Sequence, residues 1–150
     1  MSLVDQVGPE FVVRHASETD EDAVVGIDSA ASQDGGERRE LIRMWCERGV
    51  LLLAEDTYVL LGYCVVEYTF FEQGFISMLM VAPSARRWGV GRRLLAAAAA
   101  SCTARKMFTS TNVSNQAMQQ LLQQAGWSAV GLVHGLDEGD PELFYLCPRP

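Results

Sequence analysis

The feature that most constrains the fold of this chain is a glycine-containing loop between an apolar segment and an alanine-rich segment. The loop spans residues 86–91 and reads Arg-Arg-Trp-Gly-Val-Gly. Residues 75–81, before it, have the length and apolarity of a buried strand, and Pro83 ends that strand. Residues 92–105, after it, contain no Gly or Pro and include five consecutive alanines, which favour a helix. The two glycines therefore fall where a strand turns into a helix.

Such a turn has the properties of an anion-binding site. The first N–H groups of a helix have no intrahelical partner, and the helix dipole places its positive end there. Glycine lets a phosphate approach the main chain closely. Four of the twelve basic residues of the chain lie here, namely Arg86, Arg87, Arg92 and Arg93. Since the formal net charge of the chain is −7, this local excess of positive charge favours the binding of an anion. A solvated helix start is an alternative that the loop alone does not exclude.

Length and composition narrow the class of protein. With 150 residues, 49% of them hydrophobic and 21% charged, the chain is expected to form one globular domain over residues 1–150. The acidic balance and the single lysine argue against nucleic acid as a partner. No apolar run has the length of a membrane span, and the first residues do not resemble a secretory signal, so we expect a cytoplasmic protein without membrane contact.

The cysteines favour reduced thiols over a disulfide or metal role. Cys46, Cys64, Cys102 and Cys147 are widely scattered, and none forms a Cys-x-x-Cys pair. No metal site is therefore expected.

Hydrophobic periodicity and turn residues predict a mixed sheet with helices on both faces. We expect strands at 11–14, 50–55, 58–70, 75–81, 107–110, 127–133 and 142–147, and helices at 20–31, 37–48, 88–105 and 115–125. The order β-α-α-β-β-β-α-β-α-β-β contains no repeat and no break that would indicate a second domain.

The order of the elements and two sequence motifs resemble the GNAT superfamily of acyl-CoA-dependent N-acetyltransferases. Residues 79–91 are similar to the family's core strand, turn and pyrophosphate loop, whose signature is Gln/Arg-x-x-Gly-x-Gly/Ala. Residues 112–127 are similar to its following helix, with Asn112-Val-Ser-Asn115 and the final Gly126-Trp127. The resemblance implies a mixed α/β (α+β) fold: a mostly antiparallel seven-stranded sheet, about four flanking helices, and a central parallel strand pair that splays apart.

The resemblance also implies acetyl-CoA as co-substrate and a set of residues that bind it. Backbone groups of the core strand would hydrogen-bond the pantetheine arm, and turn amides would surround the pyrophosphate. Asn115 would contact the pantetheine, with helix capping as the alternative. The residues carried over are Leu79, Met80, Val81, Arg86, Arg87, Trp88, Gly89, Val90, Gly91, Arg92 and Asn115.

The chain departs from the family at its usual catalytic positions. Phe75 stands where many relatives have a Glu that serves as base, and Leu122 stands where many have a Tyr that protonates the thiolate. Glu67, in an otherwise apolar strand, is the first substitute for the base. Tyr145 or Tyr68 could replace the acid, although no motif places either residue. Weaker candidates for the base are Glu72, His134, Asp137 and Glu138.

The implied function is an N-acetyltransferase that moves an acetyl group directly from acetyl-CoA to a primary amine. The alternatives are an acyl-CoA-binding regulatory module without turnover, supported by the two missing residues, and an anchor for another nucleotide. The acidic stretch 137–142 favours a cationic acceptor. The aromatic residues Tyr68, Phe70, Phe71 and Phe75 suit a core or dimer face, or else an acceptor pocket. A homodimer is one option for the oligomeric state, because relatives of this size are often dimers.

Overall fold

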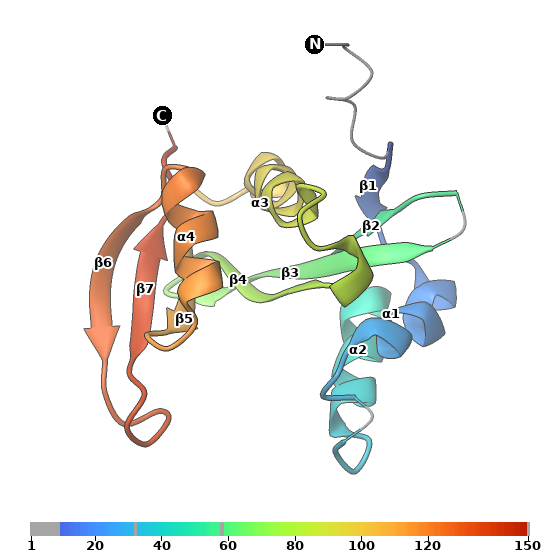
Figure 1. Ribbon diagram of the computed structural model, residues 1–150, viewed down its shortest axis with the longest axis horizontal. Coiled ribbons are helices and arrows are strands. Elements are labelled where there is room, and N and C mark those ends of the chain that lie inside the picture. Colours follow the sequence, from blue (N-terminus) through green and yellow to red (C-terminus); the bar gives the residue numbers. More distant parts are fainter. Residues whose placement is uncertain (1–9, 32, 58, 150) are drawn as a thin grey trace. The chain divides into compact units, whose positions relative to one another are not determined.

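Residues 10–31, 33–57 and 59–149 are described by a computed structural model, shown in Figure 1. The strands are β1 (Val12–His15), β2 (Leu51–Glu55), β3 (Leu60–Phe70), β4 (Gln73–Val81), β5 (Met107–Asn112), β6 (Ser128–Val133) and β7 (Glu142–Leu146). The helices are α1 (Glu21–Ile27), α2 (Glu37–Arg48), α3 (Val90–Ser101) and α4 (Gln116–Gln124), with short 3-10 turns at Glu18–Asp20 and Pro83–Ala85. The expected start of the third strand, Tyr58, lies outside the described residues.

The strands pair in the order β1-β2-β3-β4-β5-β7-β6. β1, β2 and β3 pair antiparallel, as do β5, β7 and β6, whereas β4 and β5 run parallel. The parallel ladder joins only Gly74, Phe75 and Ile76 to residues 107–109 of β5, although β4 continues to Val81. The expected fold, a mostly antiparallel seven-stranded sheet with a splayed central pair and four helices, is confirmed.

The packing divides into two compact units. The first contains the described residues up to Val65 together with Met78–Ala97, and the second contains Val66–Ser77 and the described residues from Ala98 onward. β3, β4 and α3 each run from one unit into the other. The single domain expected from the sequence stays a prediction.

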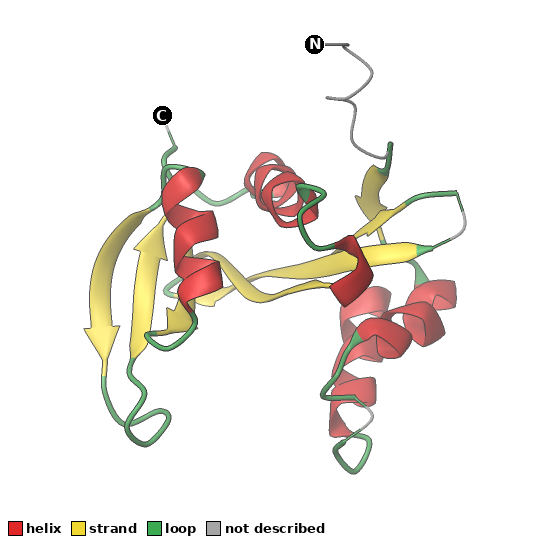
Figure 2. Ribbon diagram, viewed as in Figure 1, coloured by secondary structure: helices red, strands yellow, loops and turns green. Residues whose placement is uncertain are grey.

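In the first unit, helices cover both faces of β3. α1 and α2 lie on one side of the strand and the start of α3 on the other (Figures 1 and 2). Strand alternation explains this arrangement, because successive side chains point to opposite faces. Tyr63 and Val65 join the core beneath α1 and α2, whereas Cys64 points to α3 and donates from Sγ to the carbonyl oxygen of Leu94 at 3.8 Å.

In the second unit, β5 and β7 bury the side chains on one face of the sheet, and aromatic rings lie on the other face. Alternate residues of β5, beginning with Met107 and Thr109, are buried, and Leu122 of α4 and Tyr145 of β7 are almost inaccessible. Every residue of β6 is exposed. None of the described helices is long and apolar enough to cross a membrane.

Two helices are shorter than the sequence predicted. The helix expected at 20–31 ends at Ile27, because Asp28 adopts an extended conformation and its carboxylate accepts the N–H groups of Ala30 and Ala31. The helix expected to reach Arg105 ends at Ser101.

Side chains from distant segments explain the early end of α3. The N–H of Thr103 donates to the phenolic oxygen of Tyr68 at 3.1 Å, and the N–H of Lys106 donates to Oε1 of Gln73 at 2.9 Å. These groups therefore do not continue the helical ladder.

One ion-pair network makes folding stability depend on pH. The Arg14 guanidinium contacts Asp20 at 2.9 Å and Glu55 at 2.6 Å, and its hydrogen bonds hold the pKa of Asp20 below 3.8. Asp20→Asn is expected to lower the free energy of unfolding by about 1 kcal/mol at pH 7, since Arg14 remains partly solvated. A depressed carboxyl pKa stabilises the fold fully at pH values above the ordinary pKa of 3.8. The difference between native protein and variant should therefore begin to shrink near pH 3.8 and be lost as the pH falls through the lowered pKa of the folded state. Urea denaturation at several pH values measures it.

The control is Asp22→Asn, because the side chain of Asp22 is 89% exposed and pairs only at the surface with Arg39. An equal loss in both variants, or a loss that persists far below pH 3.8, would contradict the assignment.

Candidate functional site

The glycine-containing loop connects β4 to α3 within the first unit. After Val81, the N–H of Ala82 donates to the carbonyl oxygen of Leu61 in β3 at 2.8 Å, which holds the chain against the sheet. One 3-10 turn follows, and its last residue, Ala85, is fully buried. Val90 and Leu94 of α3 are also buried. Apolar contacts thus fix both ends of the loop, while residues 86–89 between them are exposed.

Two residues of the loop have left-handed backbone conformations. Gly89 has φ = 76°, which glycine adopts without steric cost. Arg87 has φ = 74°, which is unfavourable for a residue with a Cβ atom. These conformations turn the chain sharply just before Val90, the first residue of α3.

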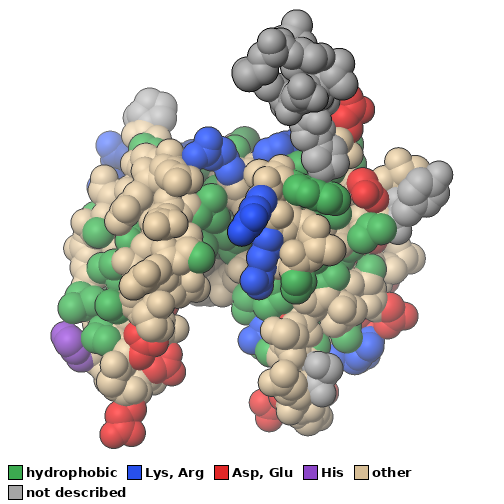
Figure 3. Space-filling view, viewed as in Figure 1, with side chains coloured by type: hydrophobic (Ala, Val, Ile, Leu, Met, Phe, Trp, Pro, Cys, Tyr) green, Lys and Arg blue, Asp and Glu red, His purple; other side chains and the backbone are tan. Residues whose placement is uncertain are grey.

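The turn leaves a group of backbone donors unpaired. Among residues 87–92, the N–H of Trp88 donates to Ala85 at 3.4 Å, whereas the other five N–H groups, those of Arg87, Gly89, Val90, Gly91 and Arg92, make no backbone hydrogen bond within the described part of the chain. The N–H of Arg93 closes the first helical turn on Gly89 at 3.1 Å. Basic side chains gather over the start of α3 in the space-filling view (Figure 3). Free N–H groups, the helix dipole and arginine charge together form a site suited to a polyanion.

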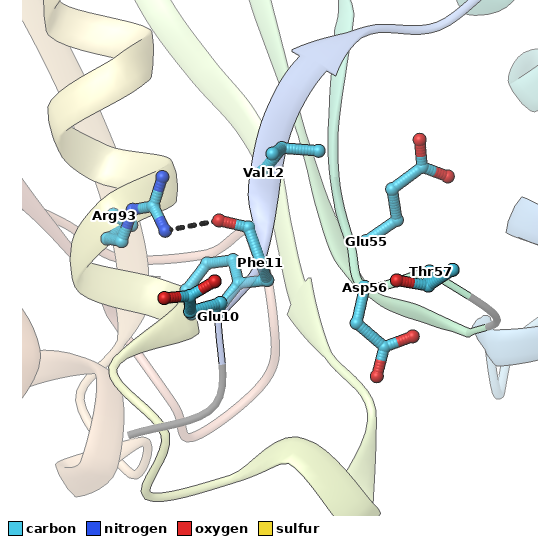
Figure 4. Close-up of a pocket in the computed structure, with 7 residues that line it drawn as sticks. All are labelled: Glu10, Phe11, Val12, Glu55, Asp56, Thr57 and Arg93. Carbon is cyan, nitrogen blue, oxygen red and sulfur yellow. Dashed lines mark hydrogen bonds between the residues drawn. The ribbon is translucent and has the colours of Figure 1, made fainter. Parts of the chain in front are cut away.

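Arg93 has a different role from its neighbours. Its Nη1 donates to the carbonyl oxygen of Phe11 at 2.6 Å, and its guanidinium lies 4.2 Å from the centre of the Phe11 ring (Figure 4). It lines a cavity of about 710 Å³ together with the acids Glu10, Glu55 and Asp56. Arg93 was counted among the four arginines at the turn, but it anchors the segment before β1, and three arginines remain to face an anion.

The second half of β4 presents a strand edge that β5 does not pair. The ladder with β5 ends at Ile76, and the residues Met78 to Val81 are half-buried. Met78 and Met80 pack against the core beneath α1 and α2. The backbone at Leu79, Met80 and Val81 is thus supported by side-chain packing, while its polar groups are not used in the β5 ladder.

Gly62 of β3 supports this strand, a role that the sequence pattern did not predict. A Cβ atom at Gly62 would lie 2.7 Å from the carbonyl oxygen of Met80, 3.1 Å from Cγ1 of Val90 and 3.3 Å from Cδ1 of Leu94. Only glycine therefore allows β4 and the start of α3 to approach β3 this closely. A glycine within a strand pattern was the available signal.

Glu67 and Tyr145 lie in the second unit, and each has a distinct environment. Glu67 is half-buried on β3 and accepts a hydrogen bond at Oε1 from the hydroxyl of Ser77 at 2.5 Å. Ser77 precedes Leu79 by two residues in β4. Tyr145 is 1% exposed, and its hydroxyl has no hydrogen-bond partner among the described residues. A buried hydroxyl without a hydrogen-bond partner destabilises the fold, so this hydroxyl is suited to form a hydrogen bond with a bound ligand.

Asn115 is the residue preceding α4, and its Oδ1 caps the helix by accepting from the N–H of Met118 at 3.1 Å. Capping was the alternative expected for it. Acidic side chains of the stretch 137–142 also form hydrogen bonds within the unit, because Asp137 accepts from Asn112 and Asp140 accepts from Ser114. Glu72 occupies the β3–β4 turn with φ = 64°.

The two positions that depart from the family are apolar and packed. Leu122 is fully buried, and the Phe75 ring lies 5.0 Å from that of Phe70. Phe70 also contacts Phe108 and Phe144, and these three rings, without that of Phe75, line a groove of about 340 Å³ beside β6.

Neither a metal cluster nor a reactive cysteine is found among the described residues. No three His, Cys, Asp or Glu side chains lie together in a way that could hold a metal ion. The four cysteines are free and buried, and burial raises the pKa of the Cys64 thiol to about 12 and that of Cys46 to about 11.

Comparison with known proteins finds one family among both the sequence models and the solved structures. A model of the acetyltransferase (GNAT) family matches residues 16–127. The crystal structure of a GNAT-family acetyltransferase from Bacillus cereus is 31% identical in sequence, with a TM-score of 0.86 over 92% of this chain and 96% of that chain. No curated protein matches the chain.

Two further structures share the fold at lower identity. The diaminobutyrate acetyltransferase EctA of Paenibacillus lautus, in complex with L-2,4-diaminobutyric acid and coenzyme A, is 18% identical, with a TM-score of 0.74 over 94% of this chain and 96% of that one. The protein yncA of Salmonella typhimurium, with its cofactor acetyl-CoA, is 19% identical, with a TM-score of 0.71 over 92% and 93%.

The close approach at Gly62 predicts a large cost for a small substitution. In Gly62→Ala the added methyl group must displace the Met80 carbonyl, which belongs to the backbone and cannot rotate away. We expect the free energy of unfolding to fall by about 1–3 kcal/mol, measured by chemical denaturation. Gly131→Ala is the matched control in β6, because nothing lies within 4 Å of its Cβ position. Equal stability of the two variants would contradict the packing argument.

Proposed function

Because the chain belongs to the acetyltransferase (GNAT) family, we propose that it transfers the acetyl group of acetyl-CoA directly to a primary amine. The observation that carries the proposal is the set of five unpaired N–H groups between Arg87 and Arg92, at the start of a helix and beneath three exposed arginines. Acetyl-CoA supplies the acetyl group as a thioester and brings a pyrophosphate that these donors suit.

The loop and the strand edge bind different parts of acetyl-CoA. N–H groups of residues 87–92 hold the pyrophosphate, and Arg86, Arg87 and Arg92 add positive charge around it. Trp88, which is 41% exposed in the same turn, contacts the cofactor there. Backbone groups of Leu79, Met80 and Val81 hydrogen-bond the pantetheine arm as an added strand would. The complexes of the Paenibacillus and Salmonella proteins with coenzyme A or acetyl-CoA support acetyl-CoA as the ligand of this fold.

The chemistry requires one proton to leave the amine and one to reach the sulfur. An alkylammonium titrates near pH 10, so Glu67 takes its proton, directly or through water. A backbone N–H of β4 stabilises negative charge on the carbonyl oxygen. The new C–N bond forms as the C–S bond breaks, and the Tyr145 hydroxyl gives a proton to the departing thiolate. The nitrogen then loses its second proton to water, and water returns a proton to Tyr145. The partnerless state of that hydroxyl among the described residues supports this role.

Transfer is direct rather than through a cysteine. A thiolate is the nucleophilic form of cysteine, and the raised pKa values of Cys46 and Cys64 keep both thiols protonated near neutral pH.

A binding module without turnover is the second candidate. The apolar residues Phe75 and Leu122, packed where relatives have acid–base groups, favour it. The acidic stretch 137–142 suits an acceptor with a positive charge, although Asp137 and Asp140 already accept hydrogen bonds within the unit.

Removing one N–H group tests the pyrophosphate site. In Val90→Pro the first residue of α3 loses its N–H, and proline suits this helix position. Val90→Ala loses comparable packing but keeps the N–H. We expect Val90→Pro to bind acetyl-CoA at least about tenfold more weakly than Val90→Ala, because a hydrogen bond to a charged group contributes about 1.5–3 kcal/mol.

Calorimetric titration measures both affinities, and acetyl-pantetheine, which lacks the pyrophosphate, is the ligand control. If Val90→Pro weakens both ligands equally, the N–H group does not contact the pyrophosphate. If the native protein does not bind acetyl-CoA, the proposed function is wrong.

Conservative variants test the two proton-transfer residues. Glu67→Gln and Tyr145→Phe are each expected to lower kcat by about 100-fold while leaving acetyl-CoA affinity unchanged. Tyr145→Phe should also keep or raise the free energy of unfolding, because it removes a buried hydroxyl without a partner among the described residues. Release of free thiol measures turnover. Unchanged kcat would remove the variant residue from the chemistry, and absence of turnover with every amine would favour the binding module.

A further inference from the structure

A buried charged network lies in the first unit, where α1, α2, β3 and β4 meet. The Asp28 side chain is completely inaccessible. Its Oδ1 accepts the N–H groups of Ala30 and Ala31, and its Oδ2 accepts from the hydroxyl of Tyr63 and, at 3.1 Å, from Nη1 of Arg38. The carboxylate therefore has a full set of partners.

The network holds its donors in place. Burial, followed by the hydrogen bond to Asp28, raises the pKa of Tyr63, so its hydroxyl stays protonated and continues to donate. Tyr63 is fully buried on β3, and Asp28 ends α1 by leaving the helix. The Arg38 guanidinium is thus attached to a rigid support on one side.

The other side of Arg38 is unused. The guanidinium donates from Nη1 to Asp28 and to Sδ of Met78 at 3.8 Å, and its charge also acts on the neighbouring Tyr63 hydroxyl. Within the described part of the chain, the edge formed by Nε and Nη2 makes no hydrogen bond, and the side chain is 22% exposed. A planar pair of donors on a fixed support matches the two oxygens of a carboxylate.

The position of Arg38 relates it to the strand edge of the candidate site. Met78, which Arg38 contacts, directly precedes Leu79 in β4. Its neighbours on α2 differ, because Arg39 and Arg43 pair with Glu21 at the surface and are 40% and 55% exposed. Arg38 alone of these three arginines points to β4.

We propose that Arg38 binds a carboxylate group of the acceptor, so that the acceptor carries both an amine and a carboxylate, as an amino acid does. The inference rests on the proposed acetyl transfer and names the substrate class of that reaction. Arg38 is a binding and specificity residue here, and Asp28 with Tyr63 positions it. A purely structural ion pair is the alternative.

Matched pairs of acceptors provide the test. Native protein with acetyl-CoA is assayed by thiol release with L-lysine and 1,5-diaminopentane, L-ornithine and 1,4-diaminobutane, and L-2,4-diaminobutyrate and 1,3-diaminopropane, with L-phenylalanine and 2-phenylethylamine as a monoamine pair. Each pair differs only in the carboxylate. We expect the carboxylate member of at least one pair to have at least a tenfold higher kcat/KM.

Substitution of Arg38 should remove this preference. Because Arg38→Gln alone leaves Asp28 buried without its counter-ion, the Asp28→Asn/Arg38→Gln double variant, which keeps a neutral hydrogen-bonded pair, is the one to assay. It is expected to raise KM for the carboxylate acceptor at least tenfold and to leave KM for acetyl-CoA unchanged. Arg39→Gln, a surface change on the same helix, should behave like the native protein.

The possible failures are distinguishable. Equal use of both members of every pair, or a double variant that keeps the preference, would overturn the carboxylate site and leave acetyl transfer intact. Absence of turnover with every amine, despite binding of acetyl-CoA, would overturn the proposed transfer and the inference with it.

Discussion

The contact between Gly62 and the backbone of Met80 is the constraint on which the candidate site depends. It brings β4 and the start of α3 against β3, since a side chain at Gly62 would strike Met80, Val90 and Leu94 together. That packing supports the strand edge at Leu79 and the start of α3, where the N–H groups beyond Arg86 are unpaired. A site built from backbone groups needs such support, because backbone donors cannot adjust by rotating as side chains do.

Besides forming surface ion pairs, the arginines of this acidic chain have three different roles. At the loop, Arg86, Arg87 and Arg92 remain exposed around unpaired N–H groups. Arg93, one residue further, stacks on Phe11 and stabilises the fold. Arg38 is fixed by a buried carboxylate on one side, and its other edge makes no hydrogen bond within the described residues. Charge alone therefore does not indicate function, and the partners of each guanidinium decide its role.

Local sequence signals predicted several elements well. The helix at Glu37–Arg48 has the bounds expected for it, because Gly36 and Gly49 flank it and both adopt left-handed conformations. The predicted ends of α1 and α3 were wrong. Asp28 leaves α1 to accept the N–H groups of Ala30 and Ala31 and the hydroxyl of the distant Tyr63, and the N–H of Thr103 donates to the distant Tyr68. Periodicity and helix propensity contain no information about such partners. The catalytic candidates Glu67 and Tyr145 stay predictions for a related reason, since no local motif places them.

The sequence by itself determined the order of the elements and the strand–turn–helix that carries the loop. Those features follow from hydrophobic periodicity and from the backbone freedom of glycine, which act over a few residues. Only the tertiary structure decided that Gly62 supports β4, that Arg93 faces Phe11 and that Arg38 is held by Asp28 through one edge of its guanidinium. These arrangements join residues far apart in the chain, and they are set by which side chains meet when the sheet and helices pack.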